Sequence, residues 1–195
     1  VVVLDNLSTG RLPNVQGFMS NPSFQFIDGS VLDKECLKPQ VEAADIVYHM
    51  AAAVGVKFVV EHLIDTLENN LRGTQDLLEL AHQCGNKKVI LASSSEVYGN
   101  SPEMPWKEDG NLSLGPTSVG RWGYACSKIL DEFLALAYYK EKNLPVVVLR
   151  FFNTVGPGQS GRYGMVLPRF VSQAVAGEPI TVYGDGDQSR CFTYV

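Results

Sequence analysis

The residue types and spacing that suggest chemistry most clearly are a tyrosine and a lysine four positions apart, Tyr124 and Lys128. In a helix, this spacing places both side chains on one face, one turn apart. An ammonium group near a phenol favours the phenolate and lowers the pKa of the tyrosine. Such a tyrosine can accept a proton from a sugar hydroxyl while hydride leaves the same carbon. The spacing also arises by chance, so a surface tyrosine and a solvated lysine are the alternative interpretation.

Polar side chains follow two of the apolar segments. Ser94 lies in a run of three serines that follows residues 88–92 and precedes Glu96. A hydroxyl at the carboxyl end of a parallel strand lies where open α/β sheets bind ligands, although three serines also suit a plain turn. Asp5 ends the apolar segment 1–5. An acid at the end of the second strand of a dinucleotide-binding fold binds the adenosine ribose 2′-hydroxyl, and a turn aspartate is the alternative.

These residues need a scaffold of strands and helices, which the apolar pattern predicts. We expect strands over 1–5, 24–28, 45–49, 88–92, 145–151 and 180–183, and helices over 61–84, 121–142 and 165–176. Residues 102–115 are rich in proline, glycine and polar side chains and predict a loop. Several strands are continuously apolar, which is typical of a parallel sheet covered by helices on both faces.

Composition excludes several classes of protein. The 195 residues are 45% hydrophobic and carry 16 basic against 21 acidic side chains, a net charge of −5, so we expect no nucleic-acid partner. No apolar run approaches the roughly 20 residues that a membrane span requires. The four cysteines are widely spaced, so we predict no metal site and interpret them as reduced core thiols of a cytoplasmic protein.

Six ordered segments together carry a resemblance to a known family. They are DNLSTG at 5–10, YHMAA at 48–52, SSSEVYG at 93–99, YACSK at 124–128, LRFFNTVGP at 149–157 and GDGDQSRCFTYV at 184–195. Over essentially the whole chain they resemble the extended short-chain dehydrogenase/reductase family, and within it the NAD-dependent nucleotide-sugar epimerases, dehydratases and decarboxylases. The resemblance implies an α/β fold with a Rossmann-like, doubly wound parallel sheet that binds NAD over 1–152. The start of a smaller nucleotide-sugar-binding region follows over 153–195.

The resemblance also implies roles for individual residues. Ser94 holds the sugar O4, Tyr124 is the base, Lys128 is its partner, and Glu96 is an acid/base or shapes the C5–C6 region of the sugar. The implied NAD-binding residues are Asp5, Asn6, Ser30, Val31, Ala51, Ala52, Asn69, Asn70 and Phe152. The implied substrate-binding residues are Asn153, Thr181, Tyr183 and Arg190. Ser30 departs from the family pattern, which often has aspartate there, and this puts its adenine contact in doubt.

Members of this family oxidise a sugar at C4 with NAD to a 4-keto intermediate and then diverge. Glu96 favours a UDP-glucuronate decarboxylase or a Glu-containing dehydratase, because plain 4-epimerases usually have a small or uncharged residue there. A UDP-glucose 4-epimerase-type enzyme is the alternative within the family. A non-catalytic nucleotide-sugar-binding relative and a small-molecule ketoreductase are alternatives of other classes. The first is disfavoured by the intact Ser94, Tyr124 and Lys128, and the second by Asn153 and Arg190. The expected substrate is UDP-linked.

The resemblance also sets expectations about completeness and assembly. The Gly-rich turn GxxGxxG, where the family binds the pyrophosphate at a helix N-terminus, does not precede Asp5. Further residues are expected after Val195, so we expect the chain as given to bind NAD poorly and to be inactive. A homodimer formed through the helices at 61–84 and 121–142 is also implied, with Tyr138 and Tyr139 as candidates for the contact.

Overall fold

The structure is a computed structural model, and it describes residues 1–53, 55–159, 161 and 165–195. The strands are β1 (Val2–Asp5), β2 (Gln25–Asp28), β3 (Ile46–His49), β4 (Lys88–Ser94), β5 (Val146–Phe151), β6 (Asn153–Val155) and β7 (Phe192–Tyr194). The helices are α1 (Lys34–Ala43), α2 (Val56–Glu61), α3 (Leu63–Gln83), α4 (Arg121–Lys142) and α5 (Val166–Ala176). A 3-10 turn, η3 (Ser95–Tyr98), follows β4 directly.

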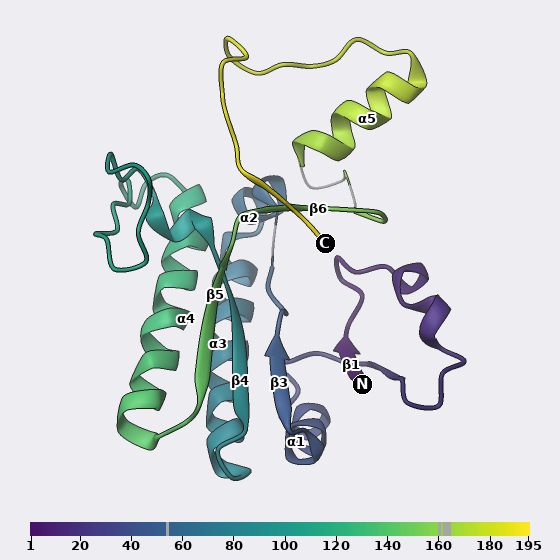
Figure 1. Cartoon of the computed structure of the whole chain (residues 1–195), viewed down its shortest axis with the longest axis vertical. Coiled ribbons are helices and arrows are strands. Elements are labelled where there is room, and N and C mark those ends of the chain that lie inside the picture. The colour runs from purple at the N-terminus through teal and green to yellow at the C-terminus, as the bar shows by residue number, and fades with distance from the viewer. Residues whose placement is uncertain (54, 160, 162–164) are drawn as a thin grey trace.

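The strands pair in parallel throughout the part of the chain that the structure describes. β3, β4 and β5 form a three-stranded sheet in that order, β1 pairs with β2, and β6 pairs with β7. Parallel neighbours need long crossover connections, and α3 and α4 supply those of the three-stranded sheet while packing side by side (Figure 1). The predicted α/β fold with parallel strands is therefore confirmed. Its strands fall into separate sheets, because no hydrogen bonds join β1 to β3 among the described residues.

The core lies between the three-stranded sheet and helices α1, α3 and α4. Its buried side chains include Val41 of α1, Leu77 and Leu78 of α3, and Val89 and Leu91 of β4. The expectation that all four cysteines are core thiols is wrong for Cys126 and Cys191, which are exposed, although all four are free. Not one helix of the described residues combines the length and the hydropathy that crossing a membrane requires.

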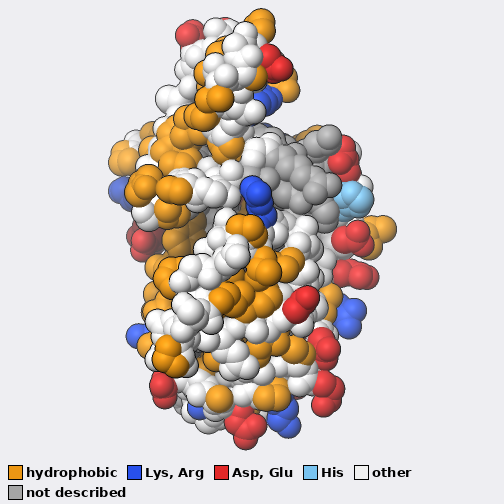
Figure 2. All heavy atoms as spheres, turned by 90° about the vertical axis from the view of Figure 1, so that its right-hand side faces the viewer, with side chains coloured by type: hydrophobic (Ala, Val, Ile, Leu, Met, Phe, Trp, Pro, Cys, Tyr) orange, Lys and Arg blue, Asp and Glu red, His pale blue; other side chains and the backbone are white. Residues whose placement is uncertain are grey.

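The opposite face of the three-stranded sheet keeps apolar side chains exposed. Along β5, half-buried residues alternate with exposed ones, which include Val147 and Leu149. This alternation is typical of a strand with one covered face. Hydrophobic side chains also gather on the side of the molecule that carries β1 (Figure 2), and the segment beside that strand exposes Phe18 and Met19.

One predicted strand was wrong and one short helix was missed. The helix expected over 61–84 is confirmed as α3 (Leu63–Gln83). The helix α2, which precedes it and ends at Glu61, was not predicted; His62 separates the two with a φ of −133°, which is not helical. The strand expected over 180–183 is not formed. The Thr181 N–H, which a strand would use for pairing, instead donates to the Gln173 side chain of α5 at 3.1 Å. The strand that does form after α5 is β7, which the sequence reasoning missed.

We expect Leu78→Ala to lower the free energy of unfolding by about 2–5 kcal/mol, because it removes a core side chain and leaves a cavity. Leu78 is 0% exposed, whereas Val175 on α5 is 84% exposed, so Val175→Ala is the control. The control should change the stability by less than about 0.5 kcal/mol. Urea unfolding followed by circular dichroism measures both variants, and equal midpoints would contradict the assignment of the core.

Candidate active site

Two neighbouring cavities lie at the carboxyl ends of the parallel strands. The larger has a volume of about 610 Å³ and is lined by the ends of β4 and β5, by α4, by β6 and by the start of α5. The smaller, of about 320 Å³, is lined by the residues that follow β1, β2 and β3 and by α3. Met50 and Ala52 line both cavities, so the two adjoin. This edge of the sheet is where open α/β folds bind ligands.

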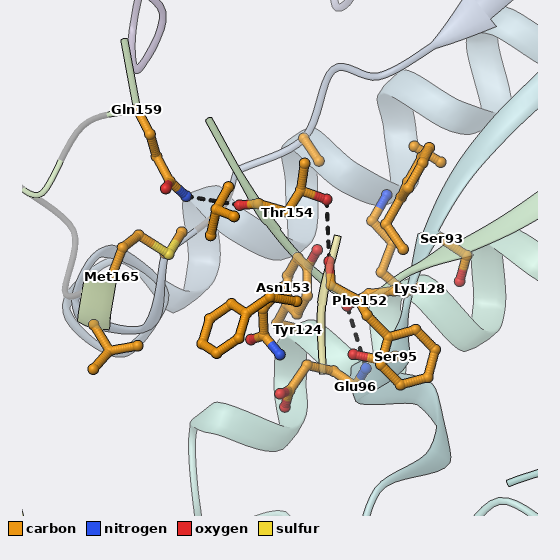
Figure 3. A pocket seen from close by; sticks show the side chains of 18 of the residues that line it. Ser93, Ser95, Glu96, Tyr124, Lys128, Phe152, Asn153, Thr154, Gln159 and Met165 are labelled. Atoms are coloured by element: carbon orange, nitrogen blue, oxygen red, sulfur yellow. Dashed lines mark hydrogen bonds between the residues drawn. The ribbon is translucent and has the colours of Figure 1, made fainter. Parts of the chain in front are cut away.

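Most of the predicted site residues come together in these two cavities. The larger cavity is lined by Ala52, Ser94, Glu96, Tyr124, Lys128, Phe152 and Asn153 (Figure 3). The smaller cavity is lined by Asp5, Asn6, Ser30, Val31, Ala51, Ala52 and Asn69. The residues expected to be catalytic thus share one cavity, and the residues expected to bind NAD are mostly in its neighbour.

Four predicted site residues line neither cavity. Asn70 is buried between α3 and α4, where its amide donates to Ser127 Oγ at 3.1 Å. Thr181, Tyr183 and Arg190 lie on the exposed segment between α5 and β7. The Tyr183 ring stacks 4.6 Å below the guanidinium of Arg169. Asn153 is the predicted substrate-binding residue that lines the larger cavity, and its amide donates to the Cys191 carbonyl at 2.8 Å.

Ser94 and Tyr124 are adjacent in the larger cavity. Ser94 ends β4 and begins η3, and its hydroxyl accepts a hydrogen bond from the Glu96 backbone N–H at 3.2 Å. Burial raises the pKa of Tyr124 above its ordinary value, a side-chain hydrogen bond with Ser94 lowers it, and the charges of Glu96 and Asp131 raise it. The sequence-based expectation that Lys128 lowers the pKa of Tyr124 is therefore wrong for this structure.

Lys128 has a different partner from the one expected. Its ammonium group lies 3.1 Å from the Asp131 carboxylate, and the two side chains are only 3% and 1% exposed. Burial raises the pKa of Asp131, and the neighbouring Lys128 and the Thr74 hydroxyl oppose that rise. The spacing of four does place Lys128 and Tyr124 on the same cavity wall. The lysine charge, however, is offset by a carboxylate on its own helix.

Glu96 is paired with an arginine that the sequence reasoning did not select as a site residue. The Arg121 guanidinium lies 3.1 Å from the Glu96 carboxylate, and both side chains are about half exposed in the larger cavity. Arg121 precedes Tyr124 by three positions, so both lie on one side of α4. That spacing is the signal that could have identified it.

Phe152, expected near the nicotinamide, belongs to a cluster of aromatic rings. Its ring centroid lies 6.3 Å from that of Tyr98 and 6.1 Å from that of Trp106, and the last two rings stack at 5.0 Å. Arg150 of β5 lies over the Tyr98 ring and donates to the Glu132 carboxylate at 2.7 Å. The cluster therefore fixes Phe152 at the cavity wall and ties the 102–115 loop, which contains Trp106, to the sheet.

The smaller cavity fits the nucleoside part of NAD by the chemistry of its side chains. The Asp5 carboxylate accepts a hydrogen bond from the Leu7 N–H at 2.6 Å, which fixes it at the end of β1. A side chain at position 10 would crowd that carboxylate, since a Cβ built on Gly10 would lie 3.0 Å from Asp5 Oδ1. A carboxylate held in this way suits ribose hydroxyls, which donate hydrogen bonds. The described residues include no group of three or more side chains placed to bind a metal ion.

Curated relatives match the chain over its full length. A UDP-N-acetyl-alpha-D-glucosaminuronate decarboxylase of Bacillus cytotoxicus is 42% identical over 196 residues, which is 100% of this chain and 60% of that protein. UDP-glucuronic acid decarboxylase 1 of Xenopus tropicalis is 36% identical over 198 residues, which is 100% of this chain and 45% of that protein. The chain therefore spans about half the length of the curated relatives it matches.

Solved structures and a family model agree with these relatives. A UDP-glucuronic acid 4-epimerase from Bacillus cereus, in complex with UDP-glucuronic acid and NAD, has a TM-score of 0.87 and 32% identity, covering 100% of this chain and 60% of that one. The sequence model for the NAD dependent epimerase/dehydratase family matches residues 1–195. The sequence-based expectation of an NAD cofactor and a Rossmann-like fold therefore agrees with the family model and with this solved structure. The chain belongs to the NAD dependent epimerase/dehydratase family.

Proposed function

We propose that the complete protein is an NAD-dependent decarboxylase of a UDP-linked hexuronate. The observation that carries the proposal is the Glu96–Arg121 ion pair, which lies in the same cavity as Ser94 and Tyr124. The two curated relatives named above support it, because both are decarboxylases of UDP-linked uronic acids. The proposal includes a boundary between the NAD-binding part, 1–152, and the start of the nucleotide-sugar-binding region, 153–195. The three-stranded sheet ends at Phe151 and a separate pair of strands begins at Asn153, which supports this boundary. The proposal also includes a cytoplasmic location.

Ser94 and Tyr124 act at the C4 oxygen of the sugar. When bound, NAD accepts hydride from C4 and later returns it. Ser94 donates a hydrogen bond to the C4 oxygen, and Tyr124 accepts the proton of the C4 hydroxyl. The C6 carboxylate is then β to a carbonyl, so the C5–C6 bond can break with its electrons moving towards the C4 oxygen as carbon dioxide leaves. Tyr124 and Ser94 stabilise the resulting enolate by donating hydrogen bonds to that oxygen.

Glu96 and Arg121 act at the carboxylate end of the sugar. A uronate carboxylate placed near Glu96 alone would be repelled, since like charges in a partly desolvated cavity disfavour each other. Arg121 offsets the Glu96 charge, and its planar guanidinium carries five N–H donors, enough for a second carboxylate. After carbon dioxide leaves, C5 needs a proton that comes from solvent, and Glu96, which is about half exposed in this cavity, relays it from water to C5. A neutral hexose has no carboxylate for Arg121 to bind.

Product analysis of the complete gene product tests the proposal. With NAD and either UDP-glucuronate or UDP-N-acetylglucosaminuronate, we expect a product lighter by one carbon dioxide in mass spectrometry. UDP-glucose is the matched substrate without a carboxylate and should be unchanged. Loss of water from UDP-glucose would indicate a dehydratase instead. A product of unchanged mass and altered retention would indicate an epimerase, and either result would reject the proposal.

Replacing the proposed base tests whether the protein is an enzyme of this mechanism. We expect Tyr124→Phe to lower kcat about 100- to 10,000-fold, because it removes the proton acceptor while keeping the ring. NAD binding, followed by fluorescence titration, should be unchanged. Tyr48→Phe is the control, because Tyr48 is an exposed tyrosine that lines neither cavity. Turnover that survives Tyr124→Phe would favour a different base or a non-catalytic binding protein.

The proposal includes a homodimer that uses the outer side of α4. Phe133, Leu136 and Tyr139 are spaced by three on this helix and are exposed despite their apolar rings and side chains. We expect Phe133→Glu to yield a monomer in size-exclusion chromatography with light scattering, because a charge cannot be buried in such a contact without a partner. Val175→Glu, at an exposed position on α5, should leave the mass unchanged. A monomeric wild-type protein would contradict this part of the proposal.

A further inference from the structure

An ion pair with almost no solvent contact lies within α4, beside the larger cavity. The Lys128 ammonium and the Asp131 carboxylate are 3.1 Å apart, one helical turn from each other. The two side chains are 3% and 1% exposed. The Arg150–Glu132 pair is the next most buried ion pair of the described residues, with side chains 16% and 9% exposed, and the pairs of Lys34 and Arg121 are more open to water, so the Lys128–Asp131 pair is the most buried.

The groups that face the pair come from three elements. His49 at the end of β3 is fully buried, and its Nε2 lies 3.0 Å from the Thr74 hydroxyl of α3. Burial, with a smaller effect of the Lys128 charge, lowers the pKa of His49 to about 3, so this ring is neutral and adds no charge. The Thr74 hydroxyl favours the charged form of Asp131. On α4 itself, Glu132 and Tyr124 are the remaining titratable neighbours, and Glu132 is engaged by Arg150 and Ser93.

We propose that Asp131 is a positioning residue, the counter-ion that keeps Lys128 charged and fixed at the wall of the larger cavity. An ammonium group cannot remain charged in a dry interior without a paired negative group, because the loss of hydration is too costly. Asp131 is the one carboxylate that lies within ion-pair distance of Lys128 in the part of the chain that the structure describes. The Thr74 hydroxyl favours the charged form of this carboxylate. Asp131 Oδ1 is buried without a hydrogen-bond partner among the described residues, so Lys128 is the main partner of the carboxylate.

This assignment deepens the proposed function and rests on it for its effect on turnover. Lys128 lines the cavity next to Tyr124, and a cation there stabilises negative charge that develops on the phenol or on the C4 oxygen. Asp131 lines neither cavity, so it acts on the reaction through Lys128 and does not touch the substrate. The role of Asp131 is therefore separable from that of the residues that contact ligand.

Thermal unfolding of single and double variants of the complete gene product tests the pairing without any assay of activity. We expect Asp131→Asn to lower Tm by roughly 6–10 °C, because it leaves a buried ammonium without a counter-ion. Adding Lys128→Met should restore most of that loss, since the double variant has no buried charge left. If Asp131→Asn does not fold, recovery of folded protein in the double variant supports the pairing in the same way as a restored Tm. The exposed pair of Lys34 and Glu79 is the matched control, and Glu79→Gln should move Tm by less than about 2 °C.

Nuclear magnetic resonance of lysine labelled with carbon-13 at Cε reports the charge directly. The Lys128 signal is assigned by its absence in Lys128→Met. Wild type and Asp131→Asn are compared at the same pH. In the wild-type protein the signal should have the shift of a charged lysine, and in Asp131→Asn it should move towards that of a neutral lysine, because burial without a counter-ion favours the neutral form.

The turnover of Asp131→Asn connects the charge to the reaction. We expect its loss relative to wild type to grow as the pH rises, since the Lys128 proton is lost with rising pH, whereas a merely structural defect costs the same factor at every pH. Three results would each overturn the proposal. One is a loss of turnover that does not depend on pH. The others are a double variant no more stable than Asp131→Asn and a Lys128 signal that Asp131→Asn does not change. The last result is expected if burial keeps Asp131 protonated. A wild-type protein without turnover would reject the proposed function, and the stability and resonance measurements would still decide the pairing.

Discussion

Helix α4 brings three charged side chains, Lys128, Asp131 and Glu132, into the interior, and each can stay there only with a partner. Lys128 and Asp131 pair with each other. Glu132 accepts hydrogen bonds from Ser93 of β4 at 2.5 Å and from Arg150 of β5 at 2.7 Å. Because these partners lie on two strands, the helix cannot slide or rotate without leaving a buried charge unpaired. This constraint fixes the position of Tyr124, which is one turn before Lys128.

A second set of polar contacts connects the same helix to the wall between the two cavities. The Asn70 amide of α3 donates to Ser127 Oγ of α4 at 3.1 Å and accepts from the Ala53 N–H at 2.9 Å. Ser127 Oγ donates to the Tyr124 carbonyl at 2.8 Å. Ala53 follows Ala52, which lines both cavities. Asn70 therefore fixes the backbone at Tyr124 relative to the backbone at Ala53, between the two cavities. A buried residue that lines neither cavity can determine the geometry of the site in this way.

The sequence predicted what depends on short-range pattern and missed what depends on tertiary partners. Apolar runs, and alternation at 24–28, identified β1 to β5, because strands buried in a parallel sheet have few polar residues, and the spacing of Tyr124 and Lys128 identified one helix face. Asp131 was not selected, because nothing in its local sequence distinguishes a surface aspartate from a buried counter-ion. The strand at 180–183 was predicted wrongly for the same reason, since only the structure reveals that Gln173 takes the hydrogen bond of Thr181. The direction of the Tyr124 pKa shift depends mainly on burial, which the sequence does not show.

The arrangement of charges at the larger cavity has a consequence for its chemistry. Among the described residues, the two cations of its lining, Arg121 and Lys128, are paired with carboxylates, so these side chains place little net charge next to Tyr124. Burial then dominates the ionisation of the phenol and keeps it protonated. A proton acceptor that is neutral in the empty site becomes reactive only when the charges around it change, and the molecules that enter the cavity bring such a change. A positively charged nicotinamide ring would favour the phenolate, whereas a carboxylate alone would disfavour it. The balance of the two ion pairs therefore makes proton transfer at Tyr124 depend on which ligands are present together.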